Sequence, residues 1–283
     1  AYEEACLLEA NLRAAEGHDT LRALFAQADL SELELHLEFL KATAQDDADT
    51  PYKNIVALGV HAATLHHVAY EKRARPAQSM LLDAGATCCG YASDITRTWV
   101  KGGGAAASTF AQLVNGMERL QQRMCAMAKP GLEYEDLHDE SHRGVGALLR
   151  EAGVSKLSGD ELVQSGITRV FFPHGLGHSL GLQVHDVGCG LRKPKANNPY
   201  LRNTTTISER QCFSIEPGLY FIEGLLAPLR ASPYASELDW TLIEQLKAFG
   251  GIRIEDDVIV GPQGVRNLTR EILPQGGGPA VIV

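Results

Sequence analysis

The sequence predicts an α+β fold in which antiparallel sheets are flanked by helices. Segments with apolar residues at helical spacing and segments rich in β-forming residues are grouped along the chain, and they do not alternate as strand–helix–strand units. No stretch rich in Pro, Gly or Ser divides the 283 residues, of which 45% are hydrophobic. We therefore expect one packed domain over residues 1–283.

The first half of the chain is expected to contain helices, then strands, then helices again. Helices are predicted at residues 3–28, 31–45, 106–128 and 133–152. Strands are predicted between the two pairs of helices, at residues 54–60, 79–87 and 91–100. Ser31 and Glu34 form a capping-box pattern at the start of the second helix. Cys89-Gly90 is the natural two-residue turn between the second and third strands.

The second half of the chain, from Val170 onward, is rich in Gly, Pro and β-forming residues. Further strands are predicted at residues 211–215, 219–222 and 251–260. This change in composition supports the α+β class, because helices and strands then occupy separate stretches of the chain.

Charge and composition exclude several kinds of partner. The net charge of −9 argues against binding to nucleic acid or to an anionic membrane surface, since both are bound through clusters of Lys and Arg. No apolar run approaches the roughly 20 residues needed to cross a bilayer, and the N-terminus lacks the pattern of a signal peptide. The six cysteines contain no CxxC motif, so we expect free thiols and a cytoplasmic location.

Asp83 and Asp94 are the first pair of candidate ligands. If residues 89–90 form a two-residue hairpin turn, Asp94 lies opposite Gly85, two residues from Asp83. The two carboxylates then share one face as diagonal neighbours, roughly 7–8 Å apart at the backbone, and can converge on one ion. Asp83 also follows the apolar run 79–82, and a buried carboxylate needs a partner or a metal. Solvated surface aspartates are the alternative.

Glu216 and Glu255 are weaker candidates, because a lone charged residue in a strand usually faces solvent. Glu216 ends a predicted strand just before Pro217-Gly218, a turn that can present a carboxylate at the strand end. In the run 251–260, strand alternation places Arg253 and Glu255 on the same face. We therefore expect Arg253 to brace Glu255.

The densest functional signal is the glycine-rich segment 173–186, which contains His174, His178 and His185. Glycines let a ligand or another backbone approach closely. Histidines are usually ordinary polar residues, but a cluster this tight favours a functional site.

The same segment also matches the GxSxG pattern of serine hydrolases, with Ser179 as the nucleophile. That alternative needs an acid and then a histidine after the serine. The one histidine that follows is His185, six residues on, with no acid between them. It also needs a helix directly after the serine, and the glycines of this segment oppose one. The sequence therefore argues against a serine hydrolase.

Four carboxylates and one imidazole form an oxygen-rich, sulfur-free set of candidate ligands: Asp83, Asp94, His178, Glu216 and Glu255. Such a set suits two hard-to-borderline divalent ions better than a structural zinc, and its charge of about −4 matches two ions of charge +2. A two-metal site can hold a hydroxide between the ions and stabilise the oxyanion that forms when the hydroxide attacks a carbonyl.

At these residues the chain resembles the pita-bread metallopeptidases, and most closely the bacterial Xaa-Pro dipeptidases, or prolidases. Matching blocks occur in the family's order at residues 54–57, 81–86, 94–98, 173–188, 215–221, 225–228 and 250–258. The resemblance implies a pita-bread fold and hydrolysis of Xaa-Pro dipeptides by a hydroxide that bridges two divalent ions. Manganese is the usual metal of the family, and cobalt and zinc are the other candidates.

The resemblance also implies a role for each ligand. Asp83 would chelate one ion, His178 and Glu216 would bind the other, and Asp94 and Glu255 would bridge both. Glu216 would in addition serve as the general base.

The same match implies residues that line the site around the ions. The imidazoles that would stabilise the tetrahedral intermediate and move protons are His66, His174 and His185. Arg202 would pair with the C-terminal carboxylate of a dipeptide, and Arg253 would be the second substrate-binding arginine. Small peptides are the expected partners, and a homodimer is the expected assembly.

Two departures from the prolidase pattern are visible. Prolidases typically carry a further N-terminal domain that these 283 residues do not contain. In addition, His66-His67 stands where the family often has His-Tyr.

Other members of the same group remain as alternative functions. Aminopeptidase P and methionine aminopeptidase share the five ligands, whereas the segments around Arg202 and at 225–228 favour a dipeptidase. Some pita-bread domains only bind peptides and have lost ligands. The complete ligand set in this chain argues against a module that only binds.

Overall fold

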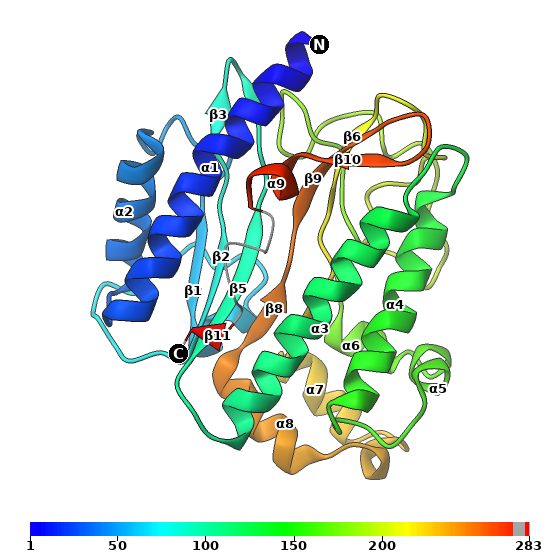
Figure 1. Cartoon of the computed structure of the whole chain (residues 1–283). Coiled ribbons are helices and arrows are strands. Elements are labelled where there is room, and N and C mark those ends of the chain that lie inside the picture. Colours follow the sequence, from blue (N-terminus) through cyan, green and yellow to red (C-terminus); the bar gives the residue numbers. More distant parts are fainter. Residues whose placement is uncertain (274–280, 283) are drawn as a thin grey trace.

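The computed structural model describes residues 1–273 and 281–282, and it begins with the two expected helices. α1 spans Tyr2–Gln27 and α2 spans Glu32–Thr43. The predicted capping box is confirmed, because the Glu34 N–H donates to Ser31 Oγ and the Ser31 N–H donates to the Glu34 carboxylate. The two helices lie together on one side of the first sheet (Figure 1).

The first sheet has the strand order β1-β2-β5-β11, and all of its strands except β11 come from the first half of the chain. Its members are β1 Ile55–Leu58, β2 Ser79–Asp83, β5 Thr96–Lys101 and β11 Val281–Ile282. Neighbours are antiparallel except β11, which runs parallel to β5. Phe25 of α1 and Phe39 of α2 pack on Val56, Leu82 and Trp99 of this sheet. The helices thereby remove one face of the sheet from water.

The second half of the chain builds the other side of the molecule. Its strands are β6 Cys212–Ile215, β7 Gly218–Tyr220, β8 Gly251–Arg253, β9 Asp256–Val260 and β10 Val265–Asn267. They form an antiparallel sheet of order β10-β9-β6 and a separate β7-β8 pair. The α+β class with antiparallel sheets is therefore confirmed.

Helices cover this second side as well (Figure 1). They are α3 Ala105–Met127, α4 Tyr134–Glu151, α5 Gly159–Gln164, α6 Ile167–Phe171, α7 Glu223–Arg230, α8 Trp240–Leu246 and α9 Leu268–Ile272. Single 3₁₀ turns occur at η1 Gly59–Ala63, η2 Ala235–Glu237 and η3 Lys247–Phe249. The largest apolar cluster joins α3 and α4 to β6 through residues such as Phe110, Leu149 and Phe213. Within the described residues, no helix is both long and apolar enough to span a membrane.

Three predicted strands are each interrupted in the structure. The run 79–87 divides into β2 and β3 (Thr87–Cys88), the run 91–100 into β4 (Tyr91–Ala92) and β5, and the run 251–260 into β8 and β9. Chain pairing continues across the first two interruptions, since the Ala84 N–H donates to Ile95 O and the Ser93 N–H donates to Ala86 O. Asp83, Asp94 and Glu255 lie at or beside these interruptions, where the backbone leaves regular strand geometry.

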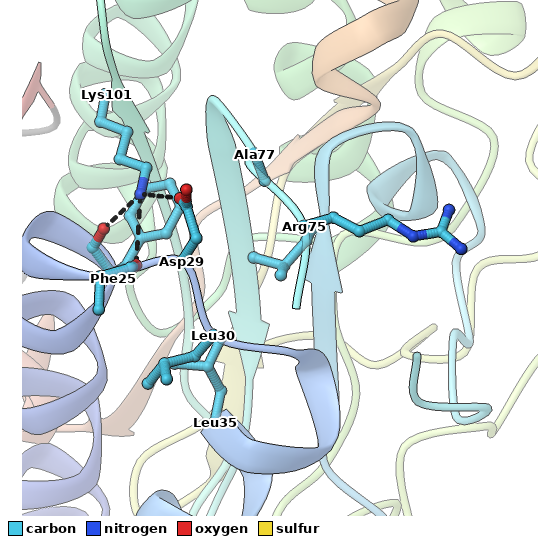
Figure 2. A pocket seen from close by; sticks show the side chains of 9 residues that line it. Phe25, Asp29, Leu30, Leu35, Arg75, Ala77 and Lys101 are labelled. Atoms are coloured by element: carbon cyan, nitrogen blue, oxygen red, sulfur yellow. Dashed lines mark hydrogen bonds and ion pairs between the residues drawn. The ribbon is translucent and has the colours of Figure 1, made fainter. Parts of the chain in front are cut away.

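A shallow hollow lies beside the first sheet (Figure 2). Lys101 closes one side of it, where its Nζ donates to Phe25 O at 2.8 Å and to Asp29 Oδ1 at 3.1 Å. Leu30 and Leu35 provide apolar walls. None of the candidate site residues lines this hollow, so the functional site lies elsewhere.

Candidate metal centre and active site

Asp83 and Asp94 converge as the hairpin register predicted. Cys88 pairs with Tyr91 across the turn, and Asp83 at the end of β2 pairs with Thr96 of β5. A single register therefore runs from the turn into the sheet. Both aspartates are buried, which rules out the alternative of two solvated surface carboxylates.

A tyrosine that the sequence did not reveal joins the two aspartates. The Tyr52 hydroxyl lies 2.7 Å from Asp83 Oδ1 and 2.6 Å from Asp94 Oδ1. Burial, followed by the charges of Asp83 and Asp94, raises the pKa of Tyr52 well above its ordinary value. The phenol therefore keeps its proton and can donate it to either carboxylate.

His178, which belongs to the second half of the chain, lies beside Asp94 of this aspartate pair. Its Nε2 lies 3.3 Å from Asp94 Oδ2, 3.7 Å from Glu216 Oε1 and 3.9 Å from Glu255 Oε1. Ligand atoms of Asp94, His178 and Glu255 all lie within 4.8 Å of one another. The five candidate ligands therefore form one cluster, which Asp83 joins through Tyr52.

Strand β6 positions both His178 and Glu216. The segment that carries His178 runs beside β6, where the Ser214 N–H donates to His178 O and the Glu216 N–H donates to Leu176 O. A side chain at Gly177 would collide with the Ser214 carbonyl and with the Tyr134 hydroxyl. This glycine lets the segment approach β6 closely enough to place its imidazole next to the carboxylate that ends the strand.

Glu255 lies between β8 and β9, where the chain contacts β5. Its N–H donates to Thr96 O, and its Oε2 accepts a hydrogen bond from Thr96 Oγ1 at 2.6 Å. Its Oε1 is buried without a hydrogen-bond partner among the described residues. A buried carboxylate oxygen without a partner is costly, and a divalent cation can satisfy several such oxygens at once. The residues present therefore fit a metal centre.

The charges in the cluster oppose one another. Burial, followed by the charges of Asp83 and Asp257, raises the pKa of Asp94 well above its ordinary value. Burial and the charges of Asp94 and Glu216 have the same effect on the pKa of Glu255. Burial also raises the pKa of Glu216, although His178 and Arg253 act against it. Cations bound among these groups would favour the ionised carboxylates.

Arg253 does not brace Glu255 as expected. Its guanidinium instead pairs with Asp83, donates to Tyr220 Oη at 2.7 Å, and donates through Nε to Thr96 Oγ1 at 3.3 Å. The break after β8 explains the difference, because Glu255 no longer continues the alternation of the strand that carries Arg253. Thr96 connects the two side chains, since it also donates to Glu255.

His174 lies on the Glu216 side of the cluster. Its Nδ1 is 3.7 Å from Glu216 Oε2, and its Nε2 is 2.9 Å from the Tyr220 hydroxyl. Burial, followed by the charge of Arg253, lowers the pKa of His174 to about 3. The ring is therefore neutral near pH 7 and can donate a hydrogen bond without adding a positive charge.

The other predicted lining residues lie at the exposed rim. The rings of His185 and His178 are perpendicular, with centroids 4.3 Å apart. Burial and the charge of His178 lower the pKa of His185 to about 4, and the charges of Arg202 and His66 act in the same direction. The backbone of Arg202 lies over Gly175, within the histidine segment. His66, His185 and Arg202 are all accessible to solvent, although the His185 ring is partly covered where it packs against His178.

Sequence reasoning missed the polar residues that hold the ligands in place. These are Tyr52, Thr96, Tyr220 and Asp257. Asp257 Oδ2 accepts a hydrogen bond from the Asp94 N–H at 3.0 Å and fixes that part of the hairpin. Thr96 and Asp257 stand two residues from Asp94 and Glu255, and this spacing is the one signal that could have indicated them.

The structure disfavours Ser179 as a nucleophile. No helix follows it directly, because the next helix along the chain after α6 is α7, which begins at Glu223. Ser179 instead forms an isolated bridge with Phe213 of β6. The strand–turn–helix geometry of a nucleophile elbow is therefore absent from this described segment.

Comparison with known protein families decides which group contains this arrangement. The model of metallopeptidase family M24 matches residues 5–262. The chain belongs to metallopeptidase family M24. The resemblance seen in the sequence is thereby confirmed, and the architecture described above is the pita-bread fold of this family.

Curated relatives of this M24 chain are longer than the chain itself. The Xaa-Pro dipeptidase of Marinobacter nauticus is 46% identical over 272 residues, which cover 95% of this chain and 62% of the relative. The Xaa-Pro dipeptidase of Cronobacter sakazakii is 44% identical over 281 residues, covering 96% and 62%. The chain thus spans about three fifths of the length of these relatives.

Solved aminopeptidase structures share the fold of this chain. Zinc-substituted aminopeptidase P of E. coli in complex with product has a TM-score of 0.75 and 28% identity, over 95% of this chain and 56% of that one. The aminopeptidase PepP of Pseudomonas aeruginosa has a TM-score of 0.75 and 26% identity, over 96% and 56%.

Proposed function

We propose that this M24 chain is a metal-dependent dipeptidase that hydrolyses Xaa-Pro dipeptides. The observation that carries the proposal is the joint presence of a five-ligand cluster and an exposed arginine at its rim. The curated relatives named Xaa-Pro dipeptidase, at up to 46% identity, support the substrate class. The alternative is an aminopeptidase, which the fold shared with aminopeptidase P at 28% identity favours.

The proposed ligand roles are those that the resemblance to the pita-bread metallopeptidases implies. Asp83 would hold one divalent ion, His178 and Glu216 would hold the other, and Asp94 and Glu255 would be shared by both. Bound ions supply Lewis acidity, which lowers the pKa of water and polarises a carbonyl. Manganese is the proposed ion, with cobalt or zinc as alternatives, because the donor set is rich in oxygen and contains no sulfur.

Glu216 is the proposed general base. It lies at the end of β6 between His174 and His178, and burial raises its pKa. A carboxylate with a raised pKa takes a proton from an attacking water more readily, and it can then protonate the leaving proline nitrogen. Because Glu216 also binds a metal, its replacement should affect both functions.

The histidines at the site are proposed to bind the reacting carbonyl rather than to carry charge. The lowered pKa values of His174 and His185 keep both rings neutral near pH 7. Neutral imidazoles donate N–H groups to an oxygen that becomes negative in the tetrahedral intermediate. His66 is proposed to do the same from the exposed rim. Arg253 acts indirectly, since its bonds to Asp83 and Tyr220 hold that wall of the substrate site.

Arg202 is the proposed anchor for the C-terminal carboxylate of the substrate. Its backbone packs over Gly175 between two site histidines, and its side chain is exposed. A guanidinium binds a carboxylate in a planar fork. One such pair at a fixed distance from the reacting carbonyl would limit the substrate to two residues.

The substrate test compares dipeptides with their amides, which carry no terminal carboxylate. Arg202→Ala should lower kcat/KM for Xaa-Pro dipeptides about tenfold to a few hundredfold, since losing a charged hydrogen bond costs about 2–3 kcal/mol. The variant should leave the low rate on dipeptide amides unchanged. Arg192→Ala is the matched control, because Arg192 lies on the same irregular segment but pairs with Glu133. A native chain that cleaves amides or tripeptides as well as dipeptides is an aminopeptidase instead.

Some expectations about the whole protein stay predictions. We propose that residues 1–283 act as a single catalytic domain and that the protein functions in the cytoplasm, which is consistent with six free cysteines. Small peptides and not nucleic acid are the proposed partners, in keeping with the net charge of −9. A homodimer is the proposed assembly.

A further inference from the structure

A second group of metal-ligating side chains lies outside the five-ligand cluster. It consists of Glu32, His61 and His67, whose ligand atoms lie within 4.8 Å of one another. Glu32 is the first residue of α2, His61 belongs to η1, and His67 follows that turn. The group shares no residue with the five-ligand cluster and has no part in the proposed mechanism.

Both imidazoles direct a ring nitrogen at the same carboxylate. His61 Nδ1 lies 2.7 Å from Glu32 Oε1, and His67 Nε2 lies 2.7 Å from Glu32 Oε2. The two rings lie nearly side by side, with centroids 4.6 Å apart and planes at 30°. A small shift would bring both nitrogens and one oxygen to the same cation.

The carboxylate is held by backbone groups behind it. Glu32 is fully buried, and it accepts hydrogen bonds from the Leu58 N–H at 2.9 Å and from the Glu71 N–H at 2.8 Å. Burial alone would raise its pKa, but the hydrogen bonds, of which that from His67 is the strongest, lower the pKa of Glu32 to about 2. A carboxylate that is ionised and fixed by outer hydrogen bonds is a typical feature of metal sites.

The group is also open to solvent on one side. The His61 side chain is 41% exposed, whereas that of His67 is 11% exposed and that of Glu32 is fully buried. A cation can therefore enter past His61, and solvent can complete its coordination. Each ring would bind through the nitrogen that faces Glu32 and keep its proton on the other nitrogen.

We propose that Glu32, His61 and His67 form a separate mononuclear site for a divalent transition metal. Two imidazole nitrogens and one carboxylate oxygen form a donor set that zinc, copper and nickel prefer, whereas an oxygen-rich set suits manganese better. The two sites of this chain would thus differ in their preferred metal. Because His67 follows His66 directly, a bound ion would also fasten the segment that carries His66 to α2.

The test uses a variant that removes one ligand of the proposed site. His67→Tyr has a phenol in place of the imidazole whose Nε2 faces Glu32, so it offers no ring nitrogen to a metal. His36→Asn is the matched control, because His36 lies on the same helix and pairs with Asp47 instead. Metal-free protein is dialysed against zinc, and the bound zinc per chain is measured by elemental analysis.

The wild type should bind one zinc ion per chain more than His67→Tyr, and His36→Asn should equal the wild type. The comparison is repeated in the Asp94→Asn variant, in which the five-ligand cluster is impaired. Adding His67→Tyr to Asp94→Asn should again remove one zinc ion per chain. Loss of metal from the five-ligand cluster therefore cannot explain the difference. Cobalt in Asp94→Asn should give visible absorption that His67→Tyr abolishes. If His67→Tyr does not fold, His61→Gln serves instead. Equal zinc content with and without His67 would overturn the proposal.

Discussion

At the scale of single residues, the central feature is a set of buried and half-buried carboxyl groups that repel one another. Asp94, Glu216 and Glu255 lie around His178 Nε2 at 3.3–3.9 Å. Such an arrangement destabilises a protein without a cation and becomes favourable when cations are bound. Residues that orient these groups should therefore affect metal affinity without touching the metal.

Tyr52 provides a direct test of such an orienting role. Tyr52→Phe removes the hydroxyl that lies between Asp83 and Asp94. Loss of an outer partner of this kind typically costs about 10–100-fold in metal affinity or activity. Manganese titrations of activity should show that shift in the half-saturating concentration. Tyr70→Phe is the control, because its hydroxyl donates to Asn54 O instead; equal titration curves for Tyr52→Phe and wild type would contradict the assigned role.

Residue types and spacing identified the candidate ligands but not their supports. Asp83 and Asp94 could be paired because both flank a short turn of known register. Tyr52, by contrast, reaches them from a loop before β1, at a sequence separation of 31 and 42 residues. No local pattern encodes such a contact. The expected partner of Arg253 was wrong for the same reason, since the break after β8 depends on the contact of Glu255 with β5.

At the scale of elements, the site depends on how closely the histidine segment approaches β6. Residues 176–180 exchange backbone hydrogen bonds with β6 although they are not a regular strand. Three strands expected to be continuous are broken instead, because alternation alone does not show where a strand changes partner. The long helices were predicted well, since their apolar periodicity extends over several turns.

Gly177→Ala tests the close approach at β6. The added methyl group would collide with the Ser214 carbonyl and the Tyr134 hydroxyl, so the segment must move away from the strand. Overpacking of this kind lowers the free energy of unfolding by about 1–3 kcal/mol. Displacement of His178 should also reduce kcat by a larger factor than it raises KM. Urea unfolding and steady-state kinetics measure both effects. Gly224→Ala in α7, where no atom lies within 4 Å, should retain stability and activity; a similar loss there would show that the effect is not local.

The buried His18 of α1 should make the folded protein less stable in acid. It is buried, and its Nε2 lies 3.0 Å from Ala84 O. Burial lowers its pKa from 6.5 to about 3. As the pH falls, the His18 imidazole is therefore protonated in the unfolded chain at a higher pH than in the folded chain. Its contribution to stability is therefore present above pH 6.5 and is lost as the pH falls towards 3.

The measurement compares wild type with His18→Gln, which can still donate to Ala84 O but does not titrate. Between pH 7 and pH 5 the wild type should lose about 2 kcal/mol more free energy of unfolding than the variant. Urea titrations at both pH values give this difference. Parallel losses in both proteins would show that His18 does not titrate on unfolding.

At the scale of the whole molecule, the site joins the two halves of the chain. Asp83 and Asp94 come from the first sheet region, whereas His178, Glu216 and Glu255 come from the second half. The buried Arg97 of β5 supports the same junction, since it pairs with Asp256 of β9 at 2.7 Å. Bound cations would therefore add cohesion between the halves.

Removal of metal should lower the stability of the entire chain. Ions that bind only the folded form stabilise it by about 2.7 kcal/mol at 100 times Kd, which corresponds to roughly 5 °C or more in Tm. A chelator should lower Tm by this order, and manganese should restore it. Differential scanning calorimetry with and without chelator measures the change. A Tm that does not respond to saturating manganese would mean that these residues bind no ions.

The position of Glu255 along the chain has a consequence for biosynthesis. It is residue 255 of 283, whereas Asp83 and Asp94 leave the ribosome much earlier. During translation the early aspartates therefore lack their proposed bridging partner until residue 255 has been made. The proposed ions can be held by all five ligands only after that point. Loading of the proposed five-ligand site would thus follow the synthesis of residue 255, and the metal supply that the chain meets from that point would determine which ions it first contains.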